Sequence, residues 1–132
     1  MKKVVSIILS GFIFACFVSC SKNLTYNEIL AKAESQLNNN DFSGAQKTYN
    51  LALEENALDS AVYEGLAKAE HGLGEYEKAI EYWLLAIEMN PGSKLLYFNL
   101  SDSYRAAGNT EKATAELLKA VDVFPGGYTD LF

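Results

Sequence analysis

Two prolines, Pro91 and Pro125, stand 34 residues apart, and the residues before each follow the same order of small and large side chains. Units that begin at Ser60 and Lys94 can therefore be compared position by position. A period of this length is typical of helix-turn-helix repeats. The matching pairs are Tyr63 and Tyr97, Leu66 and Leu100, Gly74 and Gly108, Ala79 and Ala113, Trp83 and Leu117, and Ala86 and Ala120.

This order of residues resembles the tetratricopeptide repeat. The unit from Lys94 fits best, because Tyr104 also fills the central aromatic position, where the earlier unit has Glu70. The resemblance implies an all-α fold, a right-handed superhelical array of about three helix-turn-helix repeats. Neighbouring units must stack in such an array, since one unit cannot bury both sides of its own helical hairpin.

Residues 26–59 form a divergent first unit, in which Lys32, Asn40 and Ala57 depart from the usual pattern. Asn40 is a mild departure, because asparagine tolerates the left-handed backbone that the turn requires of glycine. The alternative is an amphipathic helical pair unrelated to the repeats. The residues that do match are Ile29, Ala33, Phe42, Ala45, Tyr49 and Ala52.

Local signals place the helix ends and the closest helix contacts. Thr25 and Glu28 have capping-box spacing, so the first helix is predicted to begin at Tyr26. Asp59 and Ser93 are expected to cap the first helices of the next two units. The small residues Ala45, Ala79 and Ala113 are expected to let the two helices of each unit approach closely.

The start of the chain has the layout of a secretory signal, with Lys2 and Lys3 before an apolar run over 4–18. This run is shorter than the about 20 residues that a membrane-spanning helix needs. Residues 17–20, Phe-Val-Ser-Cys, resemble the lipobox of bacterial lipoproteins, although phenylalanine replaces the usual leucine. The resemblance implies cleavage after residue 19 and acyl chains on Cys20.

Cys16 is a competing lipidation site, but Cys20 is favoured because the polar residues 21–23 follow it. An ordinary signal with a chance cysteine is the alternative, and it would give a soluble exported protein. Ser21 is not the aspartate that retains many lipoproteins in an inner membrane, so we expect a bacterial envelope protein in the outer membrane.

These inferences divide the chain into six segments. They are a signal peptide over 1–19, the lipidated cysteine and a short tether over 20–25, repeats over 26–59, 60–93 and 94–127, and a tail over 128–132.

Composition argues against several classes of function. The chain has 11 Lys and Arg against 17 Asp and Glu; without Lys2 and Lys3 the balance is 9 against 17, a net charge of −8. This excess argues against nucleic acid as a partner and against electrostatic membrane attachment, so the acyl chains would make the membrane contact. With no cysteine after Cys20 and one histidine, His71, we expect no metal, no cofactor and no enzyme. His71 is expected at the surface.

The resemblance also implies a groove, lined by the first helix of each unit, that receives a protein or peptide partner. Lys68 and Arg105 could bond a carboxylate there, and Phe98 is the strongest apolar candidate. The residue set with which some members grip a C-terminal carboxylate is missing, since only Asn99 matches it. The candidate groove residues are Leu30, Glu34, Leu37, Glu64, Lys68, His71, Leu95, Phe98, Asn99, Asp102 and Arg105.

The favoured function is a lipid-anchored binding scaffold or adaptor in a membrane-associated assembly. After Pro125 only seven residues follow, with no helix to cover the third unit. Either Leu131 and Phe132 fold back as a cap, or this face docks against another protein or another copy. A homo-oligomer acting as a structural subunit is therefore the main alternative, and a small catalytic domain is a weaker one.

Lipidation can be tested by the intact mass of the protein purified from bacterial membranes. We expect a chain that starts at Cys20 and carries added acyl mass, whereas Cys20→Ala should lose that mass and the membrane association. An unmodified chain would contradict lipidation and would indicate a soluble exported protein.

Overall fold

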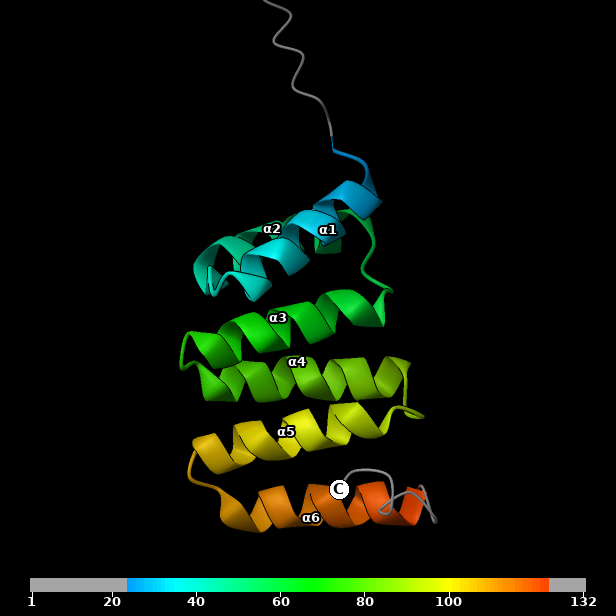
Figure 1. The fold of residues 1–132 in the computed structure, drawn as a ribbon. Helices are drawn as coiled ribbons and strands as arrows, with labels where there is room; N and C mark the ends of the chain where they lie inside the picture. Colours follow the sequence, from blue (N-terminus) through cyan, green and yellow to red (C-terminus); the bar gives the residue numbers. More distant parts are fainter. Residues whose placement is uncertain (1–23, 124–132) are drawn as a thin grey trace, which may run out of the picture.

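The computed structural model describes residues 24–123, where it forms six α-helices and no strand. The expected all-α array is confirmed, and Figure 1 shows the helices stacked one after another in chain order. Cys20, the signal segment and the C-terminal tail lie outside the described residues. The helices are α1 (Tyr26–Asn38), α2 (Phe42–Glu55), α3 (Ser60–Gly72), α4 (Tyr76–Met89), α5 (Lys94–Ala106) and α6 (Thr110–Val123).

The helix starts agree with the capping prediction at two of three places. The Thr25 hydroxyl accepts from the Glu28 N–H, and the Glu28 carboxylate accepts from the Thr25 N–H at 2.8 Å, which completes the capping box. Asp59 caps α3 through the Ala61 N–H at 2.9 Å. The prediction for Ser93 is wrong, because its side chain makes no capping bond. Its carbonyl instead accepts from the Leu96 N–H at 3.2 Å, so the backbone closes this turn.

The turns inside the three helical pairs share one geometry. Asn40, Gly74 and Gly108 have φ values of 59°, 80° and 82°, in the left-handed region that glycine and asparagine tolerate. The residue after each one donates its N–H to a carbonyl five residues earlier, which terminates the preceding helix. These bonds are Asp41 to Gln36 at 2.8 Å, Glu75 to Glu70 at 2.9 Å and Asn109 to Tyr104 at 2.8 Å.

Each pair packs through a small residue on its second helix. Ala45, Ala79 and Ala113 are all buried, as the sequence predicted. Large apolar side chains fill the remaining space and form two core clusters, with α3 contributing to both. The first contains Ile29, Ala33, Ala45, Tyr49, Ala52, Val62, Leu66 and Ala69, and the second contains Ala67, Ala79, Trp83, Ala86, Leu96 and Leu100.

Glu70 makes a polar contact at the position where the third unit has Tyr104. Its side chain is 2% exposed, and its Oε1 accepts from Gln46 Nε2 at 2.6 Å. The second carboxyl oxygen, Oε2, is buried and has no hydrogen-bond partner among the described residues. A buried polar pair thus joins α2 to α3 where an aromatic contact is usual.

No helix in the range 24–123 has the length and apolar character required to cross a bilayer.

The polar pair gives a stability prediction. We expect Gln46→Leu to lower the free energy of unfolding by about 1–3 kcal/mol, because it leaves the buried Glu70 carboxyl group unpaired. Adding Glu70→Leu removes both polar groups, so the double variant should recover most of that loss in urea unfolding. Equal stability of the Gln46→Leu variant and the original protein would contradict this account.

Candidate functional site

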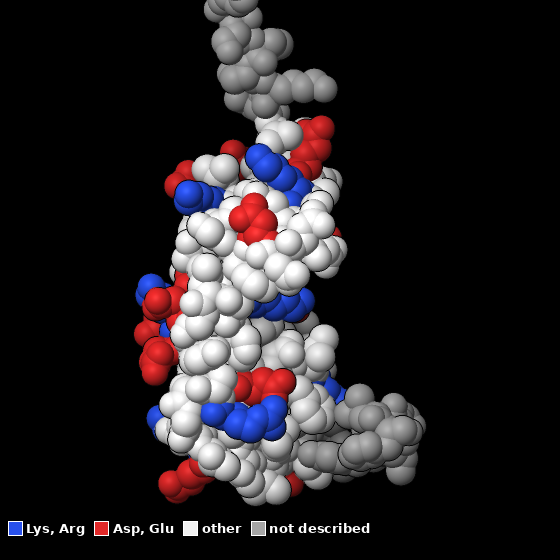
Figure 2. Space-filling model, turned by 60° about the vertical axis from the view of Figure 1, so that its left-hand side comes forward, with Lys and Arg blue, Asp and Glu red and all other residues white. Residues whose placement is uncertain are grey.

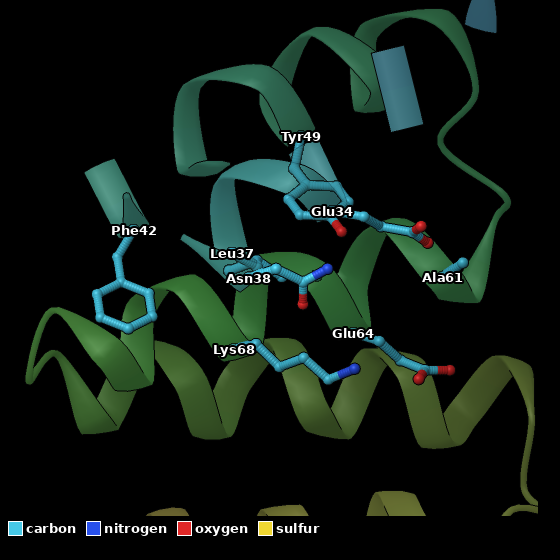
Figure 3. Close-up of a pocket in the computed structure, with 9 residues that line it drawn as sticks. Glu34, Leu37, Asn38, Phe42, Tyr49, Ala61, Glu64 and Lys68 are labelled. Atoms are coloured by element: carbon cyan, nitrogen blue, oxygen red, sulfur yellow. The ribbon is translucent and has the colours of Figure 1, made fainter. Parts of the chain in front are cut away.

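The first helices of the three pairs carry the candidate groove residues. A cavity of about 460 Å³ opens where α1 faces α3, and α1 packs directly against α3 as well as α2. Figure 3 shows side chains from both helices around it, together with Tyr49 and Phe42 from α2. Its lining residues are Glu34, Leu37, Asn38, Phe42, Tyr49, Ala61, Glu64, Gly65 and Lys68.

Tyr49 forms the floor of this cavity. It belongs to α2, but its side chain reaches between α1 and α3 and is only 3% exposed. Gly65 makes room for it, since a Cβ at this position would lie 2.1 Å from the Tyr49 Cζ. The absence of a side chain at residue 65 therefore lets an aromatic ring from the second helix reach the groove.

The cavity combines an acidic wall with this aromatic floor. Burial, together with the nearby carboxylates of Glu34 and Glu64, raises the pKa of Tyr49 to about 12. The phenol is therefore neutral at physiological pH and can both donate and accept a hydrogen bond. In Figure 3 the Glu34 and Glu64 carboxylates lie toward one end of the cavity and Phe42 toward the other.

A second, smaller cavity of about 150 Å³ lies further along the groove, where α3 faces α5. Trp83 occupies the position in its unit that Tyr49 occupies in the first, and it lines this cavity in the same way. The other lining residues are Lys68, His71, Asn99 and Asp102. The two floors differ chemically, with a phenol in one and an indole in the other.

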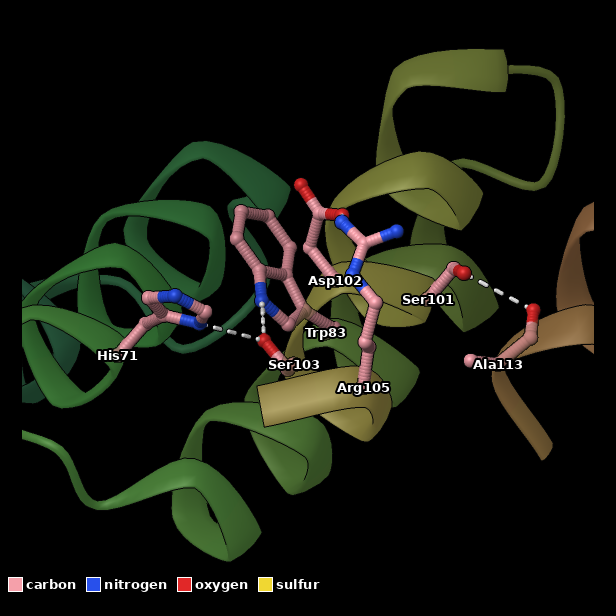
Figure 4. A network of polar contacts seen from close by, with 7 residues as sticks. All are labelled: His71, Trp83, Ser101, Asp102, Ser103, Arg105 and Ala113. Carbon is pink, nitrogen blue, oxygen red and sulfur yellow. Dashed lines mark hydrogen bonds and ion pairs between the residues drawn. The ribbon is translucent and has the colours of Figure 1, made fainter. Parts of the chain in front are cut away.

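The Trp83 indole is held by a fully buried serine. Trp83 Nε1 donates to Ser103 Oγ at 3.1 Å, and His71 Nδ1 lies 3.0 Å from the same oxygen (Figure 4). The His71 ring also stacks edge-on against Tyr76. His71 was expected at the surface, and the structure places it half-buried, with its ring in the lining of the second cavity. Because Ser103 is inaccessible, this serine–histidine pair fixes the packing of Trp83 and presents no nucleophile.

The structure brings seven of the predicted groove residues to the two cavities and places the other four elsewhere. Leu30 packs against the first core cluster, Leu95 is 59% exposed, and Phe98 is half-buried. Arg105 forms an ion pair with Asp102, one turn earlier in α5, so its positive charge already has a partner (Figure 4). The seven are Glu34, Leu37, Glu64, Lys68, His71, Asn99 and Asp102.

Sequence reasoning missed several residues that line the cavities. Tyr49, Phe42 and Trp83, from the second helices, were identified only as repeat positions. Asn38, Ala61 and Gly65, on the first helices, were not considered. Gly65 carries the available signal, because a glycine inside a helix that faces a large aromatic residue indicates a close approach. Between residues 24 and 123 no group of three or more metal-binding side chains occurs.

Comparison with known proteins identifies the repeat. Family models described as "Tetratricopeptide repeat" match residues 30–94 and 96–126. The chain belongs to the tetratricopeptide repeat family. No curated protein sequence matches it significantly.

Solved structures share this tetratricopeptide repeat fold at low sequence identity. The Yersinia enterocolitica type III secretion chaperone SycD, in complex with a peptide of the translocator YopD, matches with a TM-score of 0.73 and 18% identity, over 80% of each chain. PcrH, in complex with the chaperone binding region of PopB, matches with a TM-score of 0.72 and 18% identity, over 81% of this chain and 86% of its own. MamA matches with a TM-score of 0.74 and 18% identity, over 83% of this chain and 60% of its own.

The close approach at Gly65 yields a test of the cavity floor. We expect Gly65→Ala to lower the free energy of unfolding by about 1–2 kcal/mol, because overpacking against Tyr49 outweighs the gain in helix propensity. Gly92→Ala is the control, since beyond its two chain neighbours the nearest atom to its added Cβ is Asn90 Oδ1 at 4.0 Å. Thermal unfolding followed by circular dichroism compares the two. An unchanged Gly65→Ala variant would show that the Tyr49 ring is not held against residue 65.

Proposed function

We propose that this protein is a binding scaffold or adaptor whose groove receives an extended or helical segment of a protein partner. The observation that carries the proposal is the pair of open cavities along α1, α3 and α5, each floored by an aromatic side chain from the preceding second helix. Aromatic anchors flanked by polar groups are typical of surfaces that bind proteins.

The comparisons support a peptide partner. SycD and PcrH, which have the same fold, were each solved with a segment of another protein bound. At 18% identity the groove side chains of this chain need not match those of SycD and PcrH. The chemistry of its partner therefore has to be inferred from its own groove residues. Figure 2 shows charges of both signs in separate small groups on the visible face, without one continuous basic patch.

We further propose that acyl chains on Cys20 tether the protein to a bacterial envelope membrane, the outer rather than the inner one. The support for this anchor is the order of charges, apolar residues and cysteine over 1–20. The residues between Cys20 and Tyr26 would then form a short link between the lipid and the repeats, which would bring a bound partner close to the membrane surface.

Self-association is the competing function, and one observation favours it. Leu118 on α6, the last described helix of the array, is 60% exposed. A second copy that covers this residue would make the protein a structural subunit and leave the groove without a role in binding.

Site-specific photo-crosslinking in the cell separates these functions. Benzoylphenylalanine replaces Leu95, Leu118 on α6 or Leu51 on α2, which are 59%, 60% and 51% exposed and therefore accessible to similar degrees. Leu95 lies outside the two cavities, but it is one helical turn before the cavity residue Asn99 on the same face of α5. We expect an adduct with another protein from residue 95 and none from residue 51. A homodimer adduct from residue 118, with nothing from residue 95, would contradict the scaffold function and support self-association.

A further inference from the structure

The cavity between α1 and α3 holds two carboxylates that have no partner in the part of the chain that the structure describes. Glu34 projects from α1 and Glu64 from α3, so the two line the cavity from facing helices (Figure 3). Neither makes an ion pair or a hydrogen bond to any residue within 24–123. Burial is the main cause of the raised pKa of Tyr49, and the carboxylates of Glu34 and Glu64, which line the same cavity, raise it further.

Lys68 does not neutralise this pair. Its side chain runs along the cavity toward Glu64 in Figure 3, but it forms no ion pair within 4.0 Å of either carboxylate. Two negative charges therefore face one positive charge, and the end of the cavity next to Glu34 and Glu64 is acidic. Such a surface attracts a cation and repels an anion.

The Tyr49 hydroxyl is a further polar group that a ligand can reach. The residue is only 3% exposed, and its hydroxyl has no hydrogen-bond partner among the residues described. Its oxygen is not one of the fully buried atoms that lack a partner, so it stays open to the cavity and can donate or accept a bond there. The hydroxyl faces the cavity near Glu34, where only a group entering from solvent can reach it (Figure 3).

We propose that this cavity receives an arginine or lysine side chain of the partner segment, which binds Glu34, Glu64 and the Tyr49 hydroxyl. The inference rests on the proposed function, because it names the chemistry of the segment that the groove would bind. A guanidinium suits the site best, since its planar set of five N–H donors can serve two carboxylates and a phenol oxygen together. Leu37 and Phe42 offer apolar surface for the methylene stem.

The second cavity does not share this preference. Its carboxylate, Asp102, is bonded to Arg105, and its remaining charged side chain is Lys68. Of these two cavities, the one where α1 faces α3 is therefore the one that suits a basic residue of the partner. This difference fixes the position of the partner segment along the groove.

A peptide titration of the full chain in mild detergent tests this inference. The probe is the acetylated, amidated pentapeptide Ala-Leu-Arg-Leu-Ala, and its match contains citrulline, which has the shape of arginine without the charge. Amide chemical shifts report binding. We expect the arginine peptide to perturb α1 and α3 and to bind about tenfold more tightly than the citrulline peptide.

Two double variants with the same change in net charge complete the test. Glu34→Gln with Glu64→Gln should abolish the preference for arginine, whereas Glu54→Gln with Glu88→Gln, on the exposed surfaces of α2 and α4, should keep it. Equal binding of the two peptides to the original protein overturns the inference, and so does a preference that survives the first double variant.

The crosslinking result separates this inference from the proposed function. A partner captured at residue 95 without any arginine preference overturns the basic-residue inference and leaves the scaffold function standing. An arginine preference without a captured partner supports the charge selectivity of the cavity and overturns the scaffold function.

Discussion

In each of the first two pairs, a single large side chain from the second helix packs toward the next pair. Tyr49 and Trp83 both reach past their own first helix to the space beside the next one. The buried alanines permit this arrangement, because they let the two helices of a pair approach closely beneath the ring. The same contact that stacks the pairs also forms the floor of the groove, so stability and binding surface depend on the same two residues.

The repeat period allowed most of the fold to be predicted from the sequence. The spacing of apolar residues identifies which face of a helix is buried. Turn residues with a left-handed backbone, such as Gly74 and Asn40, mark where a helix ends. The capping box at Thr25 could be read for the same reason, because it depends only on residues three positions apart. Local rules of this kind need no knowledge of the neighbouring pair.

The groove was predicted less completely, since its chemistry depends on contacts between pairs. A side chain assigned to the core by spacing can still present its polar end to a cavity, as Tyr49 does. The bond from Trp83 to Ser103 and the contact of His71 with the same serine join residues at least 20 positions apart in the chain. Likewise, Glu70 was recognised as a departure from the family pattern, but its partner Gln46 could not be inferred without the packing of α2 on α3.

The position of α3 in both core clusters has a consequence for engineering. The first cluster contains α1 and α2 together with Val62, Leu66 and Ala69 of α3, so the packing unit is three helices long and is offset from the 34-residue period. A fragment cut at the period, residues 26–59, would lose these three core side chains. A join after α3 would keep the first cluster whole but would remove Ala67 from the second, so a transplanted module needs α3 whichever side of the chain it comes from.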